Sequence, residues 1–297
     1  MCEVSRSSTA EERDGISRAI NSAPCTDLKN HIGRHFAMTA DQSFDQSTVN
    51  VLVNDAAFVR ILTRGYWETE VEPGRWQECG GALLFGAQSR PTRVRVQGPV
   101  QVVGFSIRPG AWPALFDAPA SALADTLTPI DALWPGAGAR LSAAALDVDP
   151  DKPVFDAIEA IIRERVVARG HRPVDDAMIA LEHIARTDPS RQVADISREL
   201  GISSKQLQRR ALHCFGHTPK MVLRRSRFLD VAAVLRGIAV PGEEALCALR
   251  YYDQSHVNRE FRRFVGMTPA QFERTPTPIL TLGIQVRQSR KLQESAA

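Results

Sequence analysis

Long hydrophobic runs, paired cysteines and clustered histidines are all lacking in this chain of 297 residues. No apolar run approaches the ~20 residues that a membrane-spanning helix needs, and the N-terminus is polar rather than signal-like. The cysteines Cys2, Cys25, Cys79, Cys214 and Cys247 are odd in number and form no CxxC pair, which favours free thiols over disulfides. We therefore expect a cytoplasmic protein without a membrane partner.

The sequence also lacks the local patterns of common enzymes. No histidine lies between His35 and His171, so a unit built from this stretch has no imidazole with which to hold a catalytic metal. Neither a glycine-rich phosphate loop nor a Gly-x-Ser-x-Gly nucleophile motif is present. We expect no enzyme activity, no metal and no cofactor.

What the chain does contain is one short pattern that occurs twice, 50 residues apart. The first copy runs Leu207-Gln208-Arg209 and then Phe215-Gly216-His217-Thr218-Pro219. The second runs Val257-Asn258-Arg259 and then Val265-Gly266-Met267-Thr268-Pro269. A fixed period of this kind indicates a duplicated supersecondary unit.

Each copy has the start and stop signals of a helix. Ser203 and Gln206 have capping-box spacing, and Gly216 is placed to end the helix that they begin. In the second copy the expected N-cap is Asp253. An upstream helix stops at Gly201, so the order is helix, short turn, capped second helix. This order is the outline of a helix-turn-helix.

Charge is distributed unevenly, which the net charge of +3 conceals. Residues 203–275 contain 13 Lys+Arg and 6 Asp+Glu, a net charge of +7, whereas residues 1–202 carry −6 and the last 22 residues +2. A basic segment of helix-turn-helix units is the electrostatic pattern expected of a protein that contacts a phosphate backbone. The alternative, a solvated basic face on an ordinary helical domain, does not explain the duplication.

Two stretches of this segment resemble a known family. Residues 251–272, YYDQSHVNREFRRFVGMTPAQF, resemble the signature of AraC-type (AraC/XylS-like) transcription regulators, and residues 194–220 resemble the same family's first helix-turn-helix. The resemblance covers about residues 175–275. It implies a seven-helix domain with two helix-turn-helix units joined by one long helix, with double-stranded DNA and RNA polymerase as partners. The chain departs from the family at Arg250, where a turn glycine is usual.

Sequence readout needs exposed side chains in the N-terminal half of each second helix, because that half enters the major groove. Arg suits guanine, and Gln and Asn suit adenine. The candidate base-reading residues are Ser204, Lys205, Gln208, Arg209, Gln254, Ser255, Asn258 and Arg259. For Arg259 the alternative is an ion pair with a nearby acid. The candidate phosphate contacts are Arg224, Arg225, Arg250, Arg262 and Arg263.

Short strands are predicted between residues 49 and 107, separated by turn residues such as Gln97-Gly98-Pro99. The expected strands are 49–53, 58–63, 82–85, 93–96 and 101–107. Such spacing favours an antiparallel barrel or sandwich, and the AraC-type resemblance implies a cupin-like sensor domain here. A pocket for a small-molecule effector would be lined by Trp67, Trp76, Phe85, Phe105 and Arg108. In the alternative, the aromatic side chains are core and Arg108 is a surface cation.

The expected fold class is α+β, with an N-terminal cupin-like antiparallel β-barrel or sandwich joined to an all-α domain with two helix-turn-helix units. The expected divisions are a flexible arm at 1–48, a β-rich sensor domain at 49–152, a connecting helix and linker at 153–172, the DNA-binding domain at 173–275 and a tail at 276–297. Short helices are expected at 112–116 and 127–134. The apolar stripe of the connecting helix must pack either on its own barrel or in a homodimer.

The sequence therefore predicts a DNA-binding transcription regulator whose two units read successive major grooves. Two alternatives belong to other classes. A DNA-binding enzyme of the repair, alkyl-acceptor type would need an activated cysteine. A ligand-binding β protein with a helical interaction module would leave the basic segment unexplained.

Overall fold

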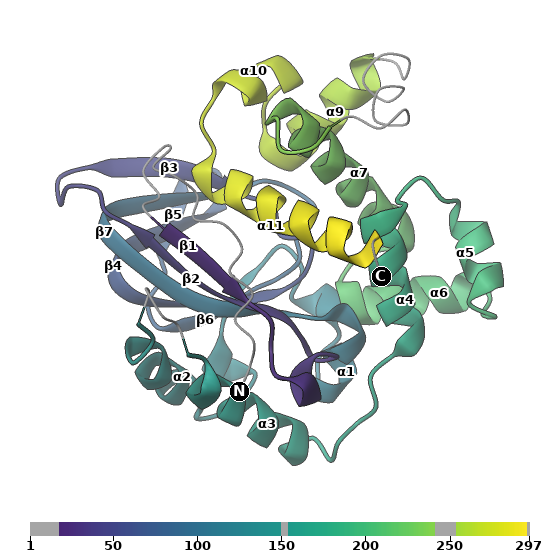
Figure 1. Ribbon diagram of the computed structural model, residues 1–297, viewed down its shortest axis with the longest axis horizontal. Helices are drawn as coiled ribbons and strands as arrows, with labels where there is room; N and C mark the ends of the chain where they lie inside the picture. The colour runs from purple at the N-terminus through teal and green to yellow at the C-terminus, as the bar shows by residue number, and fades with distance from the viewer. Residues whose placement is uncertain (1–17, 150–153, 241–253, 296–297) are drawn as a thin grey trace.

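An eight-stranded antiparallel sheet forms the N-terminal half of the molecule (Figure 1). The computed structural model describes residues 18–149, 154–240 and 254–295. The strands follow the order β1-β2-β7-β4-β6-β8, while β3 pairs with β7 and β5 pairs with β4. They are β1 (Arg18–Ser22), β2 (Ile32–Ala40), β3 (Ser47–Leu52), β4 (Phe58–Glu72), β5 (Arg75–Glu78), β6 (Ala82–Phe85), β7 (Thr92–Ile107) and β8 (Leu127–Pro129).

The two longest strands, β4 and β7, pair along most of their length and bend together. The first part of β7 pairs with β3 and the second part with β2, and the change lies at Gly98-Pro99. Gly98 has a φ of +70°, and Pro99 has no N–H to donate. On β4, a Cβ at Gly65 would lie 2.3 Å from the carbonyl oxygen of Pro99, so glycine is required. The prediction of two separate strands here is wrong, because the turn residues bend one continuous strand.

Strands β1 and β2 lie within the predicted flexible arm, so that prediction is wrong for residues 18–48. β2 lies between β1 and β7 and buries Ile32, His35 and Met38. Its pairing partner β7 is distant in the chain, so the burial depends on contacts that a local apolar pattern does not reveal. Residues 1–17 lie outside the described part of the chain.

Three helices follow β7 in the chain, and α2 and α3 lie together beneath the sheet in Figure 1. They are α1 (Trp112–Leu115), α2 (Ala137–Leu146) and α3 (Asp156–Ala168). The stripe of α3 that includes Ile158 and Ile162 is buried in one hydrophobic cluster with Val59 and Phe105 of the sheet. Of the two alternatives for this stripe, packing on the chain's own β-rich part is therefore the correct one.

The helix predicted at 127–134 is wrong. Residues Leu127–Pro129 form β8, which pairs with β6, and a 3₁₀ turn at Ile130–Ala132 follows. Pro129 lacks the N–H that a helix interior needs, while Leu127 and Thr128 have backbone partners on β6. Helix α2 begins after Pro135-Gly136, with Gly136 in the left-handed region as its N-cap.

The C-terminal half is helical, which confirms the α+β fold class. Its helices are α4 (Asp176–Thr187), α5 (Val193–Glu199), α6 (Ser204–Phe215), α7 (Pro219–Leu235), α9 (Gln254–Val265), α10 (Pro269–Arg274) and α11 (Pro278–Ser295). Of the residues described, no helix combines the length and the apolarity that crossing a membrane requires.

One hydrophobic cluster crosses the predicted boundary at residue 173. It joins Trp112 and Phe116 of the β-rich part to Met178, Leu207 and Phe215 of the helical part. The two halves therefore share a core, and removing one would expose apolar surface on the other. Apart from the arm, the predicted divisions of the chain stay a prediction.

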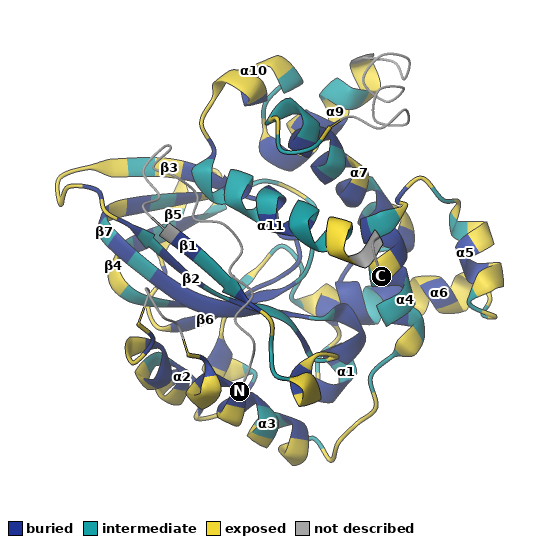
Figure 2. Ribbon diagram, in the orientation of Figure 1, coloured by how far each residue is buried: buried dark blue, intermediate teal, exposed yellow. Residues whose placement is uncertain are grey.

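The predicted tail is the helix α11, which crosses between the sheet and α7 (Figure 1). Leu280 and Ile284 are buried with Val51 of β3 and Leu229 of α7. On the other side, Ile279 and Leu282 pack against the cluster inside the sheet. Much of the helix is of intermediate exposure in Figure 2, as expected for an element covered on two sides.

Candidate DNA interface

The first helix-turn-helix comprises α5 and α6. Both halves of the predicted capping box form: the Ser203 side chain accepts from the backbone N–H of Gln206, and the Gln206 side chain accepts from that of Ser203. The turn before it contains Gly201 at a φ of +64°, and α6 ends at Gly216 at +76°. Local sequence signals therefore determine where this helix begins and ends.

One face of α6 is buried and the opposite face is open. Leu207 and Ala211 have no exposed surface. The four predicted base-reading residues of this unit are all exposed and share the N-terminal half of the helix: Ser204, Lys205, Gln208 and Arg209. The Ser204 hydroxyl also lies 3.2 Å from that of Ser197 on α5. The structure thus gathers this set on one surface, as a reading helix requires.

The second unit presents a similar face on α9. Ser255 and Arg259 are exposed and Asn258 is half-buried. The Nε of Arg259 donates to the Ser255 carbonyl at 3.2 Å. Within the described residues, no carboxylate lies within ion-pair distance of Arg259, which leaves its guanidinium open to solvent. The predicted N-cap Asp253, the phosphate candidate Arg250 and the side chain of Gln254 lie outside the described part of the chain.

The predicted phosphate contacts have different environments. Arg262 and Arg263 are exposed on α9, as the prediction requires. Arg224 forms a two-point ion pair with Glu260, one contact being Nε to Oε2 at 3.2 Å, and so joins α7 to α9. Its guanidinium is already engaged within the protein.

The prediction that Arg225 contacts phosphate is wrong for this arrangement of the chain. Its side chain is 1% exposed. It donates to the carbonyl of Gln88 at 2.7 Å and to that of Asp55 at 2.5 Å, both in the β-rich part. Burial lowers the pKa of Arg225 to about 10, so the guanidinium remains charged at neutral pH. Arg225 therefore fastens the helical half to the sheet.

The turn after α6 makes a second contact with the β-rich part. His217 is buried, and its Nε2 lies 3.0 Å from the carbonyl oxygen of Ala87. Burial, together with the charge of Arg225, lowers the pKa of His217. At Gly216, an added Cβ would lie 2.9 Å from the carbonyl oxygen of Ala120. The turn that ends α6 is therefore in close contact with the β-rich part of the molecule.

The five residues predicted to line a ligand pocket do not come together. Trp67 and Phe85 are buried in one cluster, and Phe105 is buried in another. Trp76 lies on the β4–β5 hairpin, with the guanidinium of Arg95 4.1 Å from its ring centre. Trp67, Phe85 and Phe105 therefore match the core alternative, whereas Trp76 is half-buried and matches neither interpretation.

Arg108, the fifth predicted pocket residue, links two parts of the chain through hydrogen bonds. Its Nε donates to Glu182 of α4 at 3.1 Å, and its Nη1 donates to the carbonyl of Lys29 at 3.1 Å. It therefore connects the loop before β2 to the first helix of the C-terminal half.

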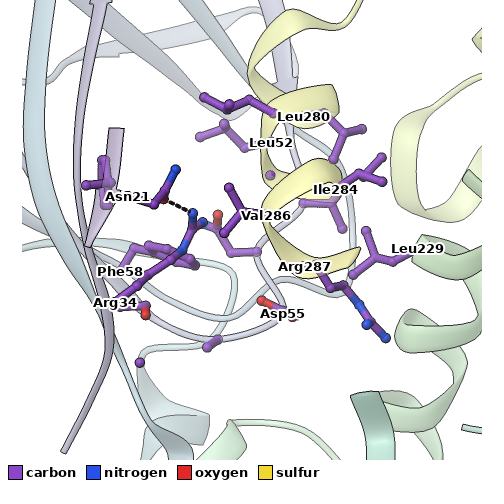
Figure 3. A pocket seen from close by; sticks show the side chains of 18 of the residues that line it. Asn21, Arg34, Leu52, Asp55, Phe58, Leu229, Leu280, Ile284, Val286 and Arg287 are labelled. Atoms are coloured by element: carbon purple, nitrogen blue, oxygen red, sulfur yellow. Dashed lines mark hydrogen bonds between the residues drawn. The ribbon is translucent and has the colours of Figure 1, made fainter. Parts of the chain in front are cut away.

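A different cavity, of about 130 Å³, lies between the sheet, α4, α7 and α11 (Figure 3). Its wall includes Arg34 of β2, Arg60 of β4 and Arg287 of α11. Sequence reasoning missed these residues, and no local signal could have found them, because they come from three distant parts of the chain. Of the residues predicted for a pocket, Trp67 belongs to this wall.

The two buried thiols, those of Cys79 and Cys214, give no support to alkyl-acceptor chemistry, which needs a thiolate. Burial raises the pKa of the Cys79 thiol to about 11 and that of the Cys214 thiol to about 12. Both thiols are therefore protonated at neutral pH. Cys2 and Cys247 lie outside the described residues.

Within the described residues, Cys25, Asp156 and Glu159 form the one group with the types of a metal site. Glu159 is nevertheless occupied by hydrogen bonds. It accepts from the Cys25 backbone at 2.9 Å, from His35 Nε2 at 3.0 Å and from Arg163 at 2.9 Å. These contacts fasten α3 to the sheet and leave the carboxylate poorly placed for a metal.

Family models match both halves of the chain. Residues 196–275 match a model described as a helix-turn-helix domain, and residues 21–129 match a domain of unknown function (DUF6597). The second match begins before residue 49 and includes the last two residues of β1 and all of β2. No curated protein matches the sequence.

Several solved structures are similar to this chain at low identity. ToxT from Vibrio cholerae is 13% identical, with 80% of this chain and 97% of that chain covered and a TM-score of 0.46. Wild-type ToxT from Vibrio cholerae with a bound unsaturated fatty acid is 12% identical, with 88% and 97% covered and a TM-score of 0.43. The AraC-like transcriptional activator CuxR is 15% identical, with 75% and 84% covered and a TM-score of 0.33.

Proposed function

Because residues 196–275 form a helix-turn-helix domain of the AraC type, we propose that this DNA-binding regulator reads two successive major grooves of one duplex. In this proposal α6 reads one groove and α9 the next, and double-stranded DNA is the direct partner. The AraC-type resemblance adds RNA polymerase as the partner through which binding alters transcription.

The observation that carries the proposal is the exposed face of α6. Its polar and basic side chains point to solvent while Leu207 and Ala211 hold the opposite face in the core. Side chains that face a groove must be exposed yet held on a rigid helix, since a loose helix loses binding free energy in becoming ordered. The capping box at Ser203 provides that rigidity at the reading end.

The joining helix supports readout by two units. Residues Pro219–Leu235 form α7, and its 17 residues span roughly 25 Å. A rigid spacer of this order suits reading helices set one DNA turn, about 34 Å, apart. Exposed Arg262 and Arg263 on α9 would contact phosphates and fix the register of the second unit.

A titration of the full chain on random-sequence duplex DNA at two salt concentrations tests the proposal. We expect affinity to fall steeply as salt rises, because each phosphate contact releases counterions. Arg262→Ala should reduce the slope of log affinity against log salt by about one. Arg75→Ala, which removes an exposed arginine from β5, is the matched control and should leave the slope unchanged. Binding that is absent, or independent of salt, would overturn the proposal.

A further inference from the structure

The cavity between the sheet and α11 has an unusual excess of positive charge. Its wall contains six arginines and two acids, Asp55 and Glu182, a formal net charge of +4. The arginines are Arg34, Arg60, Arg186, Arg225, Arg287 and Arg290. The positive charge of four of them lowers the pKa of the buried Asp55 carboxyl: Arg186, Arg225, Arg287 and Arg290. Asp55 is therefore ionised, and the net charge of +4 already includes its negative charge.

Two of the arginines have amide partners in place of carboxylates. Arg34 donates to the side-chain oxygen of Asn21, and Arg60 donates to that of Asn54 at 2.9 Å. Within the described residues, neither guanidinium has a carboxylate at ion-pair distance, and the Nη1 of Arg60 has no hydrogen-bond partner. Burial lowers the pKa of Arg60 to about 9 and that of Arg34 to about 10, and at neutral pH both remain charged.

Other polar atoms in the wall are also without a partner among the described residues. The Oγ of Ser106, 4% exposed, accepts and donates no hydrogen bond there. The same holds for Nε of Arg225, which is 1% exposed, and for Nε and Nη1 of Arg287, which is 8% exposed. Buried donors without partners are rare because each costs free energy, and they commonly indicate a site for a bound group.

The remaining wall is apolar and comes from both sides. Figure 3 shows Phe58 and Leu52 on the sheet side and Val286 of α11 opposite them, with Arg34 reaching in from its strand. The guanidiniums of Arg34 and Arg60 lie 5.3 and 4.8 Å from the ring centre of Phe58. The cavity therefore has a positively charged end and an apolar part.

We propose that this cavity binds a compact organic carboxylate, with the carboxylate held by Arg34 and Arg60 and the hydrocarbon body held between Phe58 and α11. Carboxylate oxygens match the paired N–H donors of guanidinium groups. The volume of about 130 Å³ compares with the ~150 Å³ apolar cavity known to accept benzene, so the body is about the size of one ring. This proposal rests on the proposed function in one respect, that the ligand acts on DNA binding.

The wall offers a direct route to the DNA-binding units. Arg287, on the α11 side of the cavity, ion-pairs with Asp230 of α7 at 3.3 Å and donates to the Ala185 carbonyl of α4 at 3.3 Å. Arg225 connects α7 to the loop at Asp55, which also lines the cavity. A ligand held between Arg34 and α11 would change the packing of this wall, and so would alter how α7 and α11 sit against the sheet.

Isothermal titration calorimetry of the full chain with benzoate and with benzamide, its neutral isostere, tests the site without DNA. We expect one benzoate per chain, bound at least about tenfold more tightly than benzamide, because only benzoate has a negative charge and two oxygens that accept from guanidinium groups. Arg60→Gln and Arg34→Gln should each weaken benzoate binding about tenfold. Arg64→Gln, which changes an exposed arginine of the same strand, is the matched control and should bind as the parent does.

Equal binding of benzoate and benzamide, or undiminished binding by both glutamine variants, would overturn the proposal. Circular dichroism verifies that the variants fold, and the comparison of benzoate with benzamide on the parent chain stands even if they do not. Tighter binding of a long-chain unsaturated fatty acid than of benzoate would contradict the compact body inferred from the volume.

A separate DNA titration keeps this inference distinct from the proposed function. Saturating benzoate should change the affinity of the full chain for duplex DNA by about fivefold or more, and saturating benzamide should not. Benzoate binding without any DNA binding would reject the proposed function and leave the site intact. DNA binding without benzoate binding would reject the site and leave the function intact.

Discussion

At the position after the helix-ending glycine, the first helix-turn-helix unit has His217 and the second has Met267. His217 is buried against the Ala87 carbonyl of the β-rich part, whereas Met267 is half-buried beside the aromatic cluster of the second unit. Gly216 lies against Ala120, while the nearest atom to a Cβ at Gly266 would be 3.8 Å away, on Pro91. The same turn thus meets the β-rich part closely in one copy and loosely in the other.

The interiors of the two copies differ in the same sense. Where the first has Ala211, the second has Phe261, and both are buried. Phe261 packs edge-on against Phe228 of α7 and Phe272 of α10, with ring centres 4.9 and 5.4 Å apart. The second unit is therefore held mainly by helices of its own half, and the first by the β-rich part. A structural change in the β-rich part should therefore affect the first unit more directly than the second.

The largest expected effect is on the aromatic cluster of the second unit. Phe264 has no exposed surface, so Phe264→Ala should lower the free energy of unfolding by about 3–5 kcal/mol. Chemical denaturation of the full chain measures this. Phe44→Ala is the matched control, because Phe44 is 77% exposed and its loss should change little. A loss below about 1 kcal/mol for Phe264→Ala would mean that the second unit does not depend on this packing.

A smaller effect is expected where the first unit meets the sheet. Arg225→Ala removes a buried cation together with its two hydrogen bonds, and should lower the free energy of unfolding by about 1.5–3 kcal/mol. The salt slope of DNA binding should stay unchanged, since the side chain is inside the protein. Arg262→Ala should do the reverse, with a reduced slope and unchanged stability. A reduced slope for Arg225→Ala would show that Arg225 leaves the interface to contact DNA.

The smallest effect concerns pH. Because the pKa of folded His217 is lowered, the unfolded chain binds a proton more readily than the folded one. Its contribution to stability is complete above the unfolded value of about 6.5 and is lost as pH falls through the folded value. His217→Gln can keep the hydrogen bond to Ala87 without titrating, so its stability should fall less between pH 7 and 5. Denaturation midpoints that fall equally in both proteins would contradict this.

Features determined by neighbouring residues could be predicted from the sequence. The start of α6 at Ser203, its end at Gly216 and the whole of α7 follow from capping and proline positions within a few residues. The exposed face of α6 follows from the buried positions Leu207 and Ala211 at helical spacing. These features are determined by residues that are close to one another in the sequence.

Features that depend on distant partners could not be predicted. Arg225 looks like any basic residue on a DNA-binding helix, and its burial depends on carbonyl groups at Asp55 and Gln88, more than 130 residues earlier. Strand β2 likewise depends on a distant partner, because it pairs with β7. The cavity is an extreme case, because its charge arises only when β2, β4, α4, α7 and α11 meet.

Selection of binding sites from a randomised duplex library, with the parent chain and with Arg209→Ala, tests the central claim most directly. The claim is that the exposed face of α6 reads base edges. We predict that the parent enriches a defined sequence, and that Arg209→Ala binds it about 1–3 kcal/mol more weakly and loses preference at one base position. Arg262→Ala, the matched control, should weaken all sequences about equally. Enrichment of the same sequence with the same preferences by the parent and by Arg209→Ala would contradict the claim.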